Sequence, residues 1–201
     1  MIKKKQKKRK KQISFNKTHW QAGTMLYPLP AVLISCGTEP SKYNIITISW
    51  AGTVCTDPAM LSISVRPERH SYEIIKKNKE FVVNLPSRSM AKAVDYCGVR
   101  SGRNVNKWDV CKLKAIESQH IKTPQIESCP VSIECKVKQI IPLGSHDCFI
   151  AEVVGVSVFS DLINSKGRLQ LEKAELISYI HGAYFAPGKL LGTFGYSVKK
   201  N

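Results

Sequence analysis

The stretch YNIITISWAGTVCTDPAMLSISVRPERHSYEIIKKNKEFVVNLPS, residues 43–87, decides the fold because it carries three strand signals in succession. Apolar and polar residues alternate through 43–50 and again through 60–65, which predicts two strands that each bury one face. The run 81–85 is apolar and ends at a proline, which predicts a third strand. Asp57-Pro58 is a turn signal between the first two strands.

Two short helices are predicted close to these strands. A helix is expected over 71–78, with Ser71 as the N-cap candidate and lysines in its last turn. A second helix is expected over 89–96, with Ser89 as its cap and Gly98 just past its end.

Strand signals continue on both sides of this stretch. Residues 25–35 are largely apolar, and 131–141 and 149–159 alternate as two long strands that a turn at 143–147 joins into a hairpin. Residues 190–192 are expected to form a last strand or a turn. Six to eight strands with two inserted helices do not follow a doubly wound βαβ plan. The chain is predicted to be mainly β with short helices, in a closed or partly closed antiparallel barrel.

Composition and motifs exclude several classes of protein. The chain has 201 residues, of which 43% are hydrophobic, and no run approaches the roughly 18 apolar residues that a membrane helix needs. No GxGxxG follows a strand. The segment 182–189, GAYFAPGK, is not a P-loop, because five residues separate its glycines and Leu190 stands where a magnesium-binding Ser or Thr is required.

Positive charge is concentrated at the amino end. The formal net charge is +16, and residues 1–12 hold eight Lys or Arg and no acidic residue. Such a block cannot offset its ordering entropy, so 1–20 is predicted to be a disordered basic tail and 21–201 the folded domain. The tail is open to three interpretations: a solvated arm, an arm that binds nucleic acid through counterion release, or a targeting signal. Residues 13–24 are too polar for a secretory signal.

The seven cysteines are odd in number and form no CxxC pair. Several, such as Cys36 and Cys135, lie inside apolar strand-like runs. They are interpreted as buried free thiols in a reducing cytosol, which predicts a cytoplasmic protein. No paired Cys and His stand at zinc-ligand spacing, so no metal site is expected.

Three segments resemble one family, in the family's order. Residues 43–87 are similar to the flavin-reductase-like proteins, flavoredoxins in particular, with their N-x-x-T-x-S-W/F, D-P-P/A, R-P, S/T-x-x-I and F-x-V-N pattern. Residues 96–108, YCGVRSGRNVNKW, resemble CG-x-x-SGR-x-x-DK-F/W, and 144–153, GSHDCFIAEV, resemble GDH-x-x-F-x-GEV. The resemblance spans about 25–190 and implies an FMN-binding split β-barrel, antiparallel and Greek-key-like.

Three positions depart from the family pattern. Asn106 and Ser145 stand where Asp is usual, and Ala151 stands where Gly is usual. None of them removes a cationic or hydroxyl contact to a phosphate. Ser145 leaves the orientation of His146 open.

FMN needs two kinds of surroundings. Its phosphate is stabilised by hydroxyls, N–H groups and cations, and its isoalloxazine ring needs a flat apolar slot with nearby donors. Alternation places Thr47 and Ser49 on one strand face, and Arg69 and Arg103 add positive charge. The resemblance implies that Thr47 and Ser49 reach the ribityl phosphate, while other residues lie beside the ring or close the phosphate or pyrimidine side. The predicted cofactor-binding residues are Asn44, Thr47, Ser49, Trp50, Ala51, Thr53, Arg66, His70, Ser71, Ser101, Gly102 and Lys107.

Two histidines are further candidates. The resemblance implies that His146, after the 143–147 turn, lies near the flavin and the nicotinamide, with a purely structural role in the turn as the alternative. His181 is a second candidate to approach the ring. Hydride transfer from nicotinamide to flavin needs alignment and exclusion of water but no protein base, so the catalytic residue stays unassigned.

The resemblance implies a flavoprotein oxidoreductase that passes hydride or electrons between NAD(P)H, or a redox partner protein, and FMN. A C2 homodimer is expected. The alternatives are a non-catalytic FMN electron carrier and a nucleic-acid-associated protein that acts through its basic tail. A further alternative is a relative of pyridoxamine-phosphate oxidase. The sequences of segments 44–50 and 96–108 argue against it. The choice of NADH or NADPH, the electron acceptor, and whether FMN is prosthetic or a substrate stay open.

Overall fold

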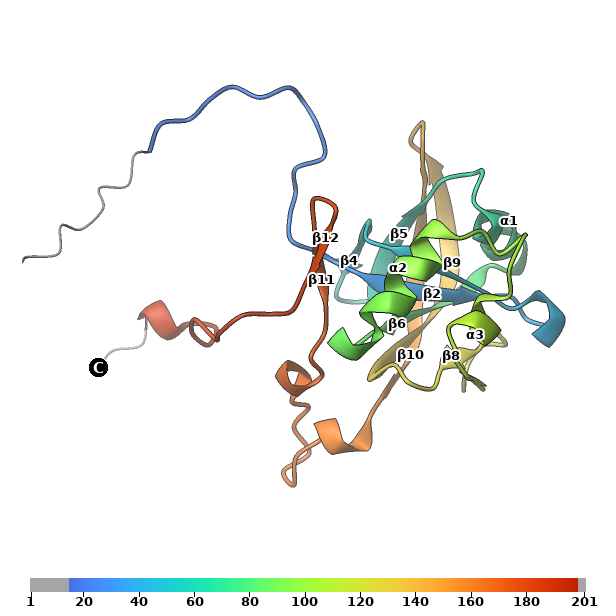
Figure 1. The fold of residues 1–201 in the computed structure, drawn as a ribbon. Coiled ribbons are helices and arrows are strands. Elements are labelled where there is room, and N and C mark those ends of the chain that lie inside the picture. Colours follow the sequence, from blue (N-terminus) through green and yellow to red (C-terminus); the bar gives the residue numbers. More distant parts are fainter. Residues whose placement is uncertain (1–14, 199–201) are drawn as a thin grey trace, which may run out of the picture.

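The computed structural model describes residues 15–198, and its main feature is a seven-stranded antiparallel sheet in the order β3-β2-β6-β9-β10-β5-β4 (Figure 1). The sheet is curled into a half-barrel, in which the edge strand β3 also approaches β5. Bulges in the long β9–β10 hairpin let it bend around the core. The strands are β2 (Val32–Cys36), β3 (Asn44–Ile48), β4 (Ala51–Cys55), β5 (Met60–Val65), β6 (Glu80–Leu85), β9 (Val131–Pro142) and β10 (Asp147–Val158).

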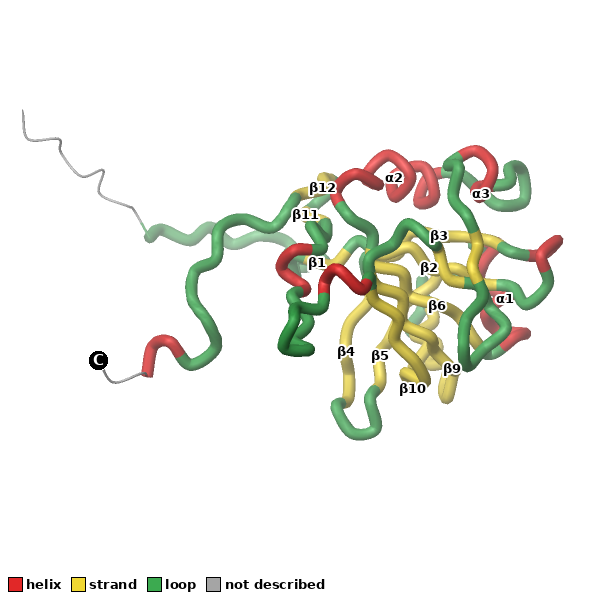
Figure 2. The backbone as a smooth tube through the Cα atoms, turned by 90° about the horizontal axis from the view of Figure 1, so that it is seen from below, coloured by secondary structure: helices red, strands yellow, loops and turns green. Residues whose placement is uncertain are grey.

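Three helices lie against this sheet, and all of them contact β3. They are α1 (His70–Asn78), α2 (Ala91–Val99) and α3 (Lys107–Val110). Figure 2 shows α2 and α3 on the outer side of the sheet, above β3. Because β2 has apolar side chains on both faces, it is buried throughout: Ile34 packs inside the barrel and Leu33 packs beneath α2.

Smaller elements complete the described chain. β1 (Leu29–Pro30), β11 (Ser178–Ile180) and β12 (Ala183–Phe185) form a three-stranded sheet, and β7 (Ala115–Ile116) pairs with β8 (Gln125–Ile126). Short 3-10 turns lie at Pro40–Lys42, Arg88–Met90, Ser160–Leu162, Leu171–Lys173 and Tyr196–Val198. The segments before β1 and after β12 extend away from the barrel on the same side (Figures 1 and 2).

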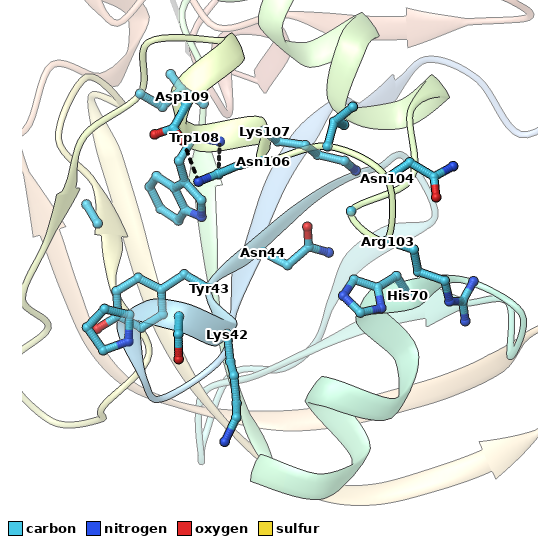
Figure 3. A pocket seen from close by; sticks show the side chains of 16 residues that line it. Lys42, Tyr43, Asn44, His70, Arg103, Asn104, Asn106, Lys107, Trp108 and Asp109 are labelled. Carbon is cyan, nitrogen blue, oxygen red and sulfur yellow. Dashed lines mark hydrogen bonds between the residues drawn. The ribbon is translucent and has the colours of Figure 1, made fainter.

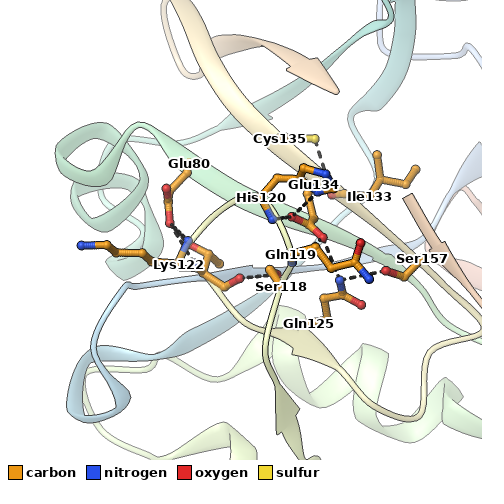
Figure 4. Close-up of polar contacts among 11 residues, drawn as sticks. Glu80, Ser118, Gln119, His120, Lys122, Gln125, Ile133, Glu134, Cys135 and Ser157 are labelled. Carbon is orange, nitrogen blue, oxygen red and sulfur yellow. Dashed lines mark hydrogen bonds and ion pairs between the residues drawn. The ribbon is translucent and has the colours of Figure 1, made fainter. Parts of the chain in front are cut away.

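A buried carboxylate holds the loop between β7 and β8 to the barrel (Figure 4). Glu134 of β9 is 1% exposed. Its oxygens accept hydrogen bonds from the backbone N–H groups of Gln119 and His120, at 3.0 and 2.7 Å, and from the Gln125 amide at 3.0 Å. Glu80 of β6 accepts two further backbone N–H groups of the same loop. The two carboxylates therefore accept hydrogen bonds from backbone N–H groups of the loop that are not paired in any strand.

The mainly β fold is confirmed, as are the expected strands within 25–35, at 43–50, 60–65 and 81–85, and the long hairpin. Three details are wrong. Gly98 lies inside α2 rather than beyond it, and Ser89 makes no capping hydrogen bond, because a 3-10 turn leads into the helix. Residues 190–192 form neither a strand nor a turn, and the last strand pairing of the described chain is that of β11 with β12.

Of the predicted tail, residues 1–14 lie outside the described range, and 15–20 are exposed and belong to no helix or strand. All seven cysteines are free; four are buried and three are half-buried. Among residues 15–198, none of the helices has the length and apolar character needed to cross a bilayer.

Candidate functional site

Two adjoining pockets lie beside β3. The first, called here the basic pocket, has a volume of about 390 Å³ and is enclosed by β3, the start of α1 and the segment from α2 to α3. The second, called the aromatic pocket, has a volume of about 260 Å³ and extends along β3 toward the tip of the β9–β10 hairpin. Ile46, Arg69 and Gly98 line both pockets, so the two adjoin one another and are together called the groove.

The basic pocket collects positive charge from separate parts of the chain. Its polar lining is Asn44, Glu68, Arg69, His70, Ser71, Arg100, Ser101, Arg103 and Lys107. Glu68 is the acid among them, and its backbone carbonyl accepts a hydrogen bond from the Arg103 guanidinium at 3.0 Å. With several cations and two hydroxyls against one carboxylate, the pocket attracts anions.

Asn44 connects the three walls of the basic pocket. Its amide donates a 2.8 Å hydrogen bond to the Ser71 hydroxyl, and both side chains are buried. Ser71 is therefore not the N-cap of α1, since the helix begins one residue earlier with Arg69 as its cap. A Cβ on Gly102 would lie 2.1 Å from the Asn44 side-chain oxygen, so only glycine allows the loop to approach β3 this closely.

Lys107 is a buried cation, 3% exposed, at the first position of α3. Its ammonium donates to the carbonyls of Ile45 at 2.8 Å and Cys97 at 2.7 Å, which joins β3 to α2. Burial lowers the pKa of this ammonium. An ammonium has three donors, so one remains for a ligand in the basic pocket.

The aromatic pocket is lined by flat side chains. Trp50, which follows β3, stacks on His146 with ring centroids 6.1 Å apart and an interplanar angle of 19°. Tyr179 and Tyr184 of the small sheet form another wall. The Thr47 hydroxyl donates to the carbonyl of Val94 in α2, which fixes the helix against β3.

A third and larger pocket, of about 640 Å³, is also lined by Asn44 (Figure 3). It shares Asn44, His70, Gly102, Arg103 and Lys107 with the basic pocket. The indole Nε1 of Trp108 is a buried polar side-chain atom that has no hydrogen-bond partner within residues 15–198. The open region around the cations is therefore wider than the basic pocket itself.

The two histidines of the groove favour the neutral state. Burial lowers the pKa of His146 and of His70 from the ordinary 6.5, and nearby Arg66 and Arg103, respectively, lower it further. The pKa of each histidine is lower in the folded protein than in the unfolded chain. Its contribution to the free energy of unfolding is therefore complete above pH 6.5 and is lost as the pH falls through the folded pKa.

We therefore expect the free energy of unfolding to fall as the pH is lowered below 6.5. A His70→Gln/His146→Gln variant should lose less over the same interval, because glutamine does not titrate. Urea denaturation across a pH series measures both slopes. Equal slopes for the two proteins would contradict the expected shifts.

The geometry agrees with a comparison to known families: residues 24–184 match the model of the flavin reductase like domain. The chain belongs to this family. The structure of a flavoredoxin of Desulfovibrio vulgaris (Miyazaki F) is similar, with a TM-score of 0.85 and 27% identity, covering 92% of this chain and 100% of that chain. A flavoredoxin from Methanosarcina acetivorans has a TM-score of 0.82 and 25% identity over the same shares. An uncharacterized protein of Archaeoglobus fulgidus is 33% identical over 132 residues, 66% of this chain and 73% of that protein.

Within this flavin reductase-like domain, most of the predicted site residues come together. Asn44, His70, Ser71, Ser101, Gly102 and Lys107 line the basic pocket, and Thr47, Ser49, Trp50, Arg66 and His146 line the aromatic pocket. Ala51 and Thr53 line neither, because β4 continues along the sheet edge; Ala51 packs on the core and Thr53 is exposed. His181 packs edge-on against Tyr27 at 5.8 Å, outside both pockets. The flavin-binding roles of all these residues stay predictions.

Sequence reasoning missed the part of the site that comes from the end of the domain. Tyr184 donates a 3.4 Å hydrogen bond to the Asp95 carboxylate of α2, and both residues line the aromatic pocket. Burial raises the pKa of Tyr184 to about 12, and the Asp95 carboxylate makes the second-largest contribution to this shift. The aromatic run around 179–184 was the available signal, but no local pattern shows that it faces α2.

Proposed function

We propose that the protein is an FMN-binding flavoprotein oxidoreductase of the flavoredoxin type. The observation that carries the proposal is that the basic and aromatic pockets adjoin one another at Ile46, Arg69 and Gly98. One elongated ligand with an anionic end and a flat ring fits this groove. Bound there, the flavin supplies the redox chemistry, exchanging hydride or electrons with NAD(P)H or a protein partner.

The residues of the chain bind and orient this cofactor. The Ser71 and Ser101 hydroxyls and the cations of the basic pocket hold the phosphate. Thr47 and Ser49, which line the aromatic pocket, would contact the ribityl chain. Trp50 and His146 form a flat wall that shields the ring from water on one side.

The basic pocket predicts a preference for FMN over riboflavin, which lacks the phosphate. An Arg103→Gln variant should bind FMN about fivefold more weakly, a loss of about 1 kcal/mol, because one partly exposed charge-assisted contact is removed. Its affinity for riboflavin should not change. Fluorescence titration with both flavins measures the difference, and Lys92→Gln, on the exposed side of α2, is the matched control. Equal weakening for both flavins would place Arg103 away from the phosphate.

An absorbance spectrum of the purified protein, repeated after anaerobic addition of NADH or NADPH, tests the proposed reaction. Flavin peaks that bleach support an NAD(P)H:flavin oxidoreductase and identify the preferred nucleotide. Peaks that persist until a protein donor is added support an electron carrier. A protein that is colourless and binds no added FMN would overturn the proposal.

We also propose a homodimer in the cytoplasm. The extended ends of the domain expose large apolar side chains, among them Leu191 at 92% and Trp20 at 79%, and a second copy could cover them. Sedimentation velocity should give the mass of a dimer, and deletion of 186–201 should reduce that mass.

Residues 1–12 lie outside the described range, so nucleic-acid binding by the tail stays a prediction. The salt dependence of the affinity for RNA tests it.

A further inference from the structure

Two thiols contact each other beside the basic pocket, and one of them, Cys97, lines it. Cys97 lies near the end of α2, Cys111 directly follows α3, and their Sγ atoms are 4.0 Å apart. A disulfide has an S–S bond of about 2.0 Å. A closing movement of about 2 Å therefore brings the two sulfurs to bonding distance.

The two thiols differ in exposure and line different cavities. Cys97 is fully buried and lines the basic pocket, whereas Cys111 is half-buried and lines a separate surface cavity of about 450 Å³. Burial raises the pKa of Cys97 to about 12, so Cys97 is poorly suited to attack an oxidant first. Because Cys111 is the more exposed of the two thiols, it is the attacking thiol and Cys97 is the resolving thiol.

The segment between the two cysteines carries much of the basic pocket. Residues 98–110 include Arg100, Ser101, Gly102, Arg103 and Lys107, all of which line it. The Lys107 ammonium also donates to the backbone carbonyl of Cys97. A bond between Cys97 and Cys111 would close this segment into a ring.

We propose that Cys97 and Cys111 form a reversible disulfide that fastens the two ends of segment 98–110 and thereby tightens flavin binding. The inference rests on the proposed function, because its effect is on FMN. Closing the ring restricts the segment before the ligand binds, which lowers the ordering cost of binding.

The oxidant is a peroxide. The Cys111 thiolate attacks one oxygen of hydrogen peroxide, the O–O bond breaks, and water leaves after protonation, which produces a sulfenic acid on Cys111. The Cys97 sulfur then attacks the Cys111 sulfur; the S–S bond forms, the S–O bond breaks, and the Cys97 proton leaves with the second water. Two thiols are oxidised, one peroxide is reduced, and an external dithiol reverses the step.

The test compares the reduced full-length protein with the protein treated with hydrogen peroxide. Peptide mass mapping reports a Cys97–Cys111 crosslink, and fluorescence titration reports the FMN dissociation constant. We expect the crosslink, a dissociation constant about three- to tenfold lower, and reversal of both by dithiothreitol. Cys111→Ser and Cys111→Ala should lose the response to peroxide. Cys129→Ser, which removes a buried thiol that contacts Met90 instead, should keep it.

The outcomes separate the two proposals. A reduced protein that binds FMN but forms no 97–111 crosslink would overturn the inference alone. The same follows if the crosslink forms and the dissociation constant stays within twofold. A protein that binds FMN in neither redox state would overturn the proposed function together with the tightening, whatever the crosslink shows.

Discussion

A Gly102→Ala variant is expected to bind FMN roughly 10- to 100-fold more weakly than the wild-type protein. The added methyl group would lie 2.1 Å from the Asn44 side-chain oxygen, so either the loop or the amide must move. If Asn44 rotates, its 2.8 Å hydrogen bond to Ser71 breaks in a buried position. If the loop moves, Ser101 and Arg103 leave the basic pocket. Both routes disturb the groups that we propose to hold the flavin phosphate, and a lost buried hydrogen bond alone costs about 1–3 kcal/mol.

Equilibrium titration of FMN fluorescence measures this loss. Gly52→Ala is the matched control, because a Cβ there meets no atom within 4 Å and the residue lies on the edge strand β4. The control should keep wild-type affinity and stability. If Gly102→Ala bound FMN as tightly as Gly52→Ala, the close contact between the loop and β3 would have no role in flavin binding.

Glu134→Ala is expected to lower the free energy of unfolding by about 3 kcal/mol, which corresponds to roughly 6–12 °C in the melting temperature of a domain this size. The carboxylate accepts three hydrogen bonds, from Gln119, His120 and Gln125. Its removal leaves these donors without their acceptor in a partly buried place, and the cost of unsatisfied donors exceeds that of a missing surface charge.

Thermal denaturation followed by circular dichroism measures the change. Glu117→Ala removes an exposed acid from the same loop, and its effect should stay within about 0.5 kcal/mol. FMN affinity should be unchanged in both variants, because neither residue lines the basic or the aromatic pocket. A Glu134→Ala protein as stable as the Glu117→Ala protein would show that water replaces the carboxylate at no cost.

Local sequence patterns were sufficient to predict most of the long strands, because the alternation of apolar and polar residues and the turn residues extend over only a few positions. The expected strand 60–65 coincides with β5, and the expected hairpin of 131–141 with 149–159 is β9–β10. The helix ends were less predictable. Ser71 has the side chain of a cap, but its hydroxyl accepts the hydrogen bond from Asn44 instead. The short strands β4, β7, β8, β11 and β12 escaped prediction, because their few residues show no clear periodicity.

The amino-acid sequence by itself determined the mainly β architecture, the positions of its principal strands along the chain and the presence of cations and hydroxyls of the kind that bind a phosphate, because these features depend on residue types and on patterns over a few neighbouring positions. Only the tertiary structure decided how these groups are used. It directs the Lys107 ammonium to the carbonyls of Ile45 and Cys97. It also places Tyr184 against Asp95 and the thiol of Cys97 against that of Cys111. Such contacts join segments 10 to 89 residues apart, and they arise from the packing of helices and end strands on a curled sheet, which no local periodicity encodes.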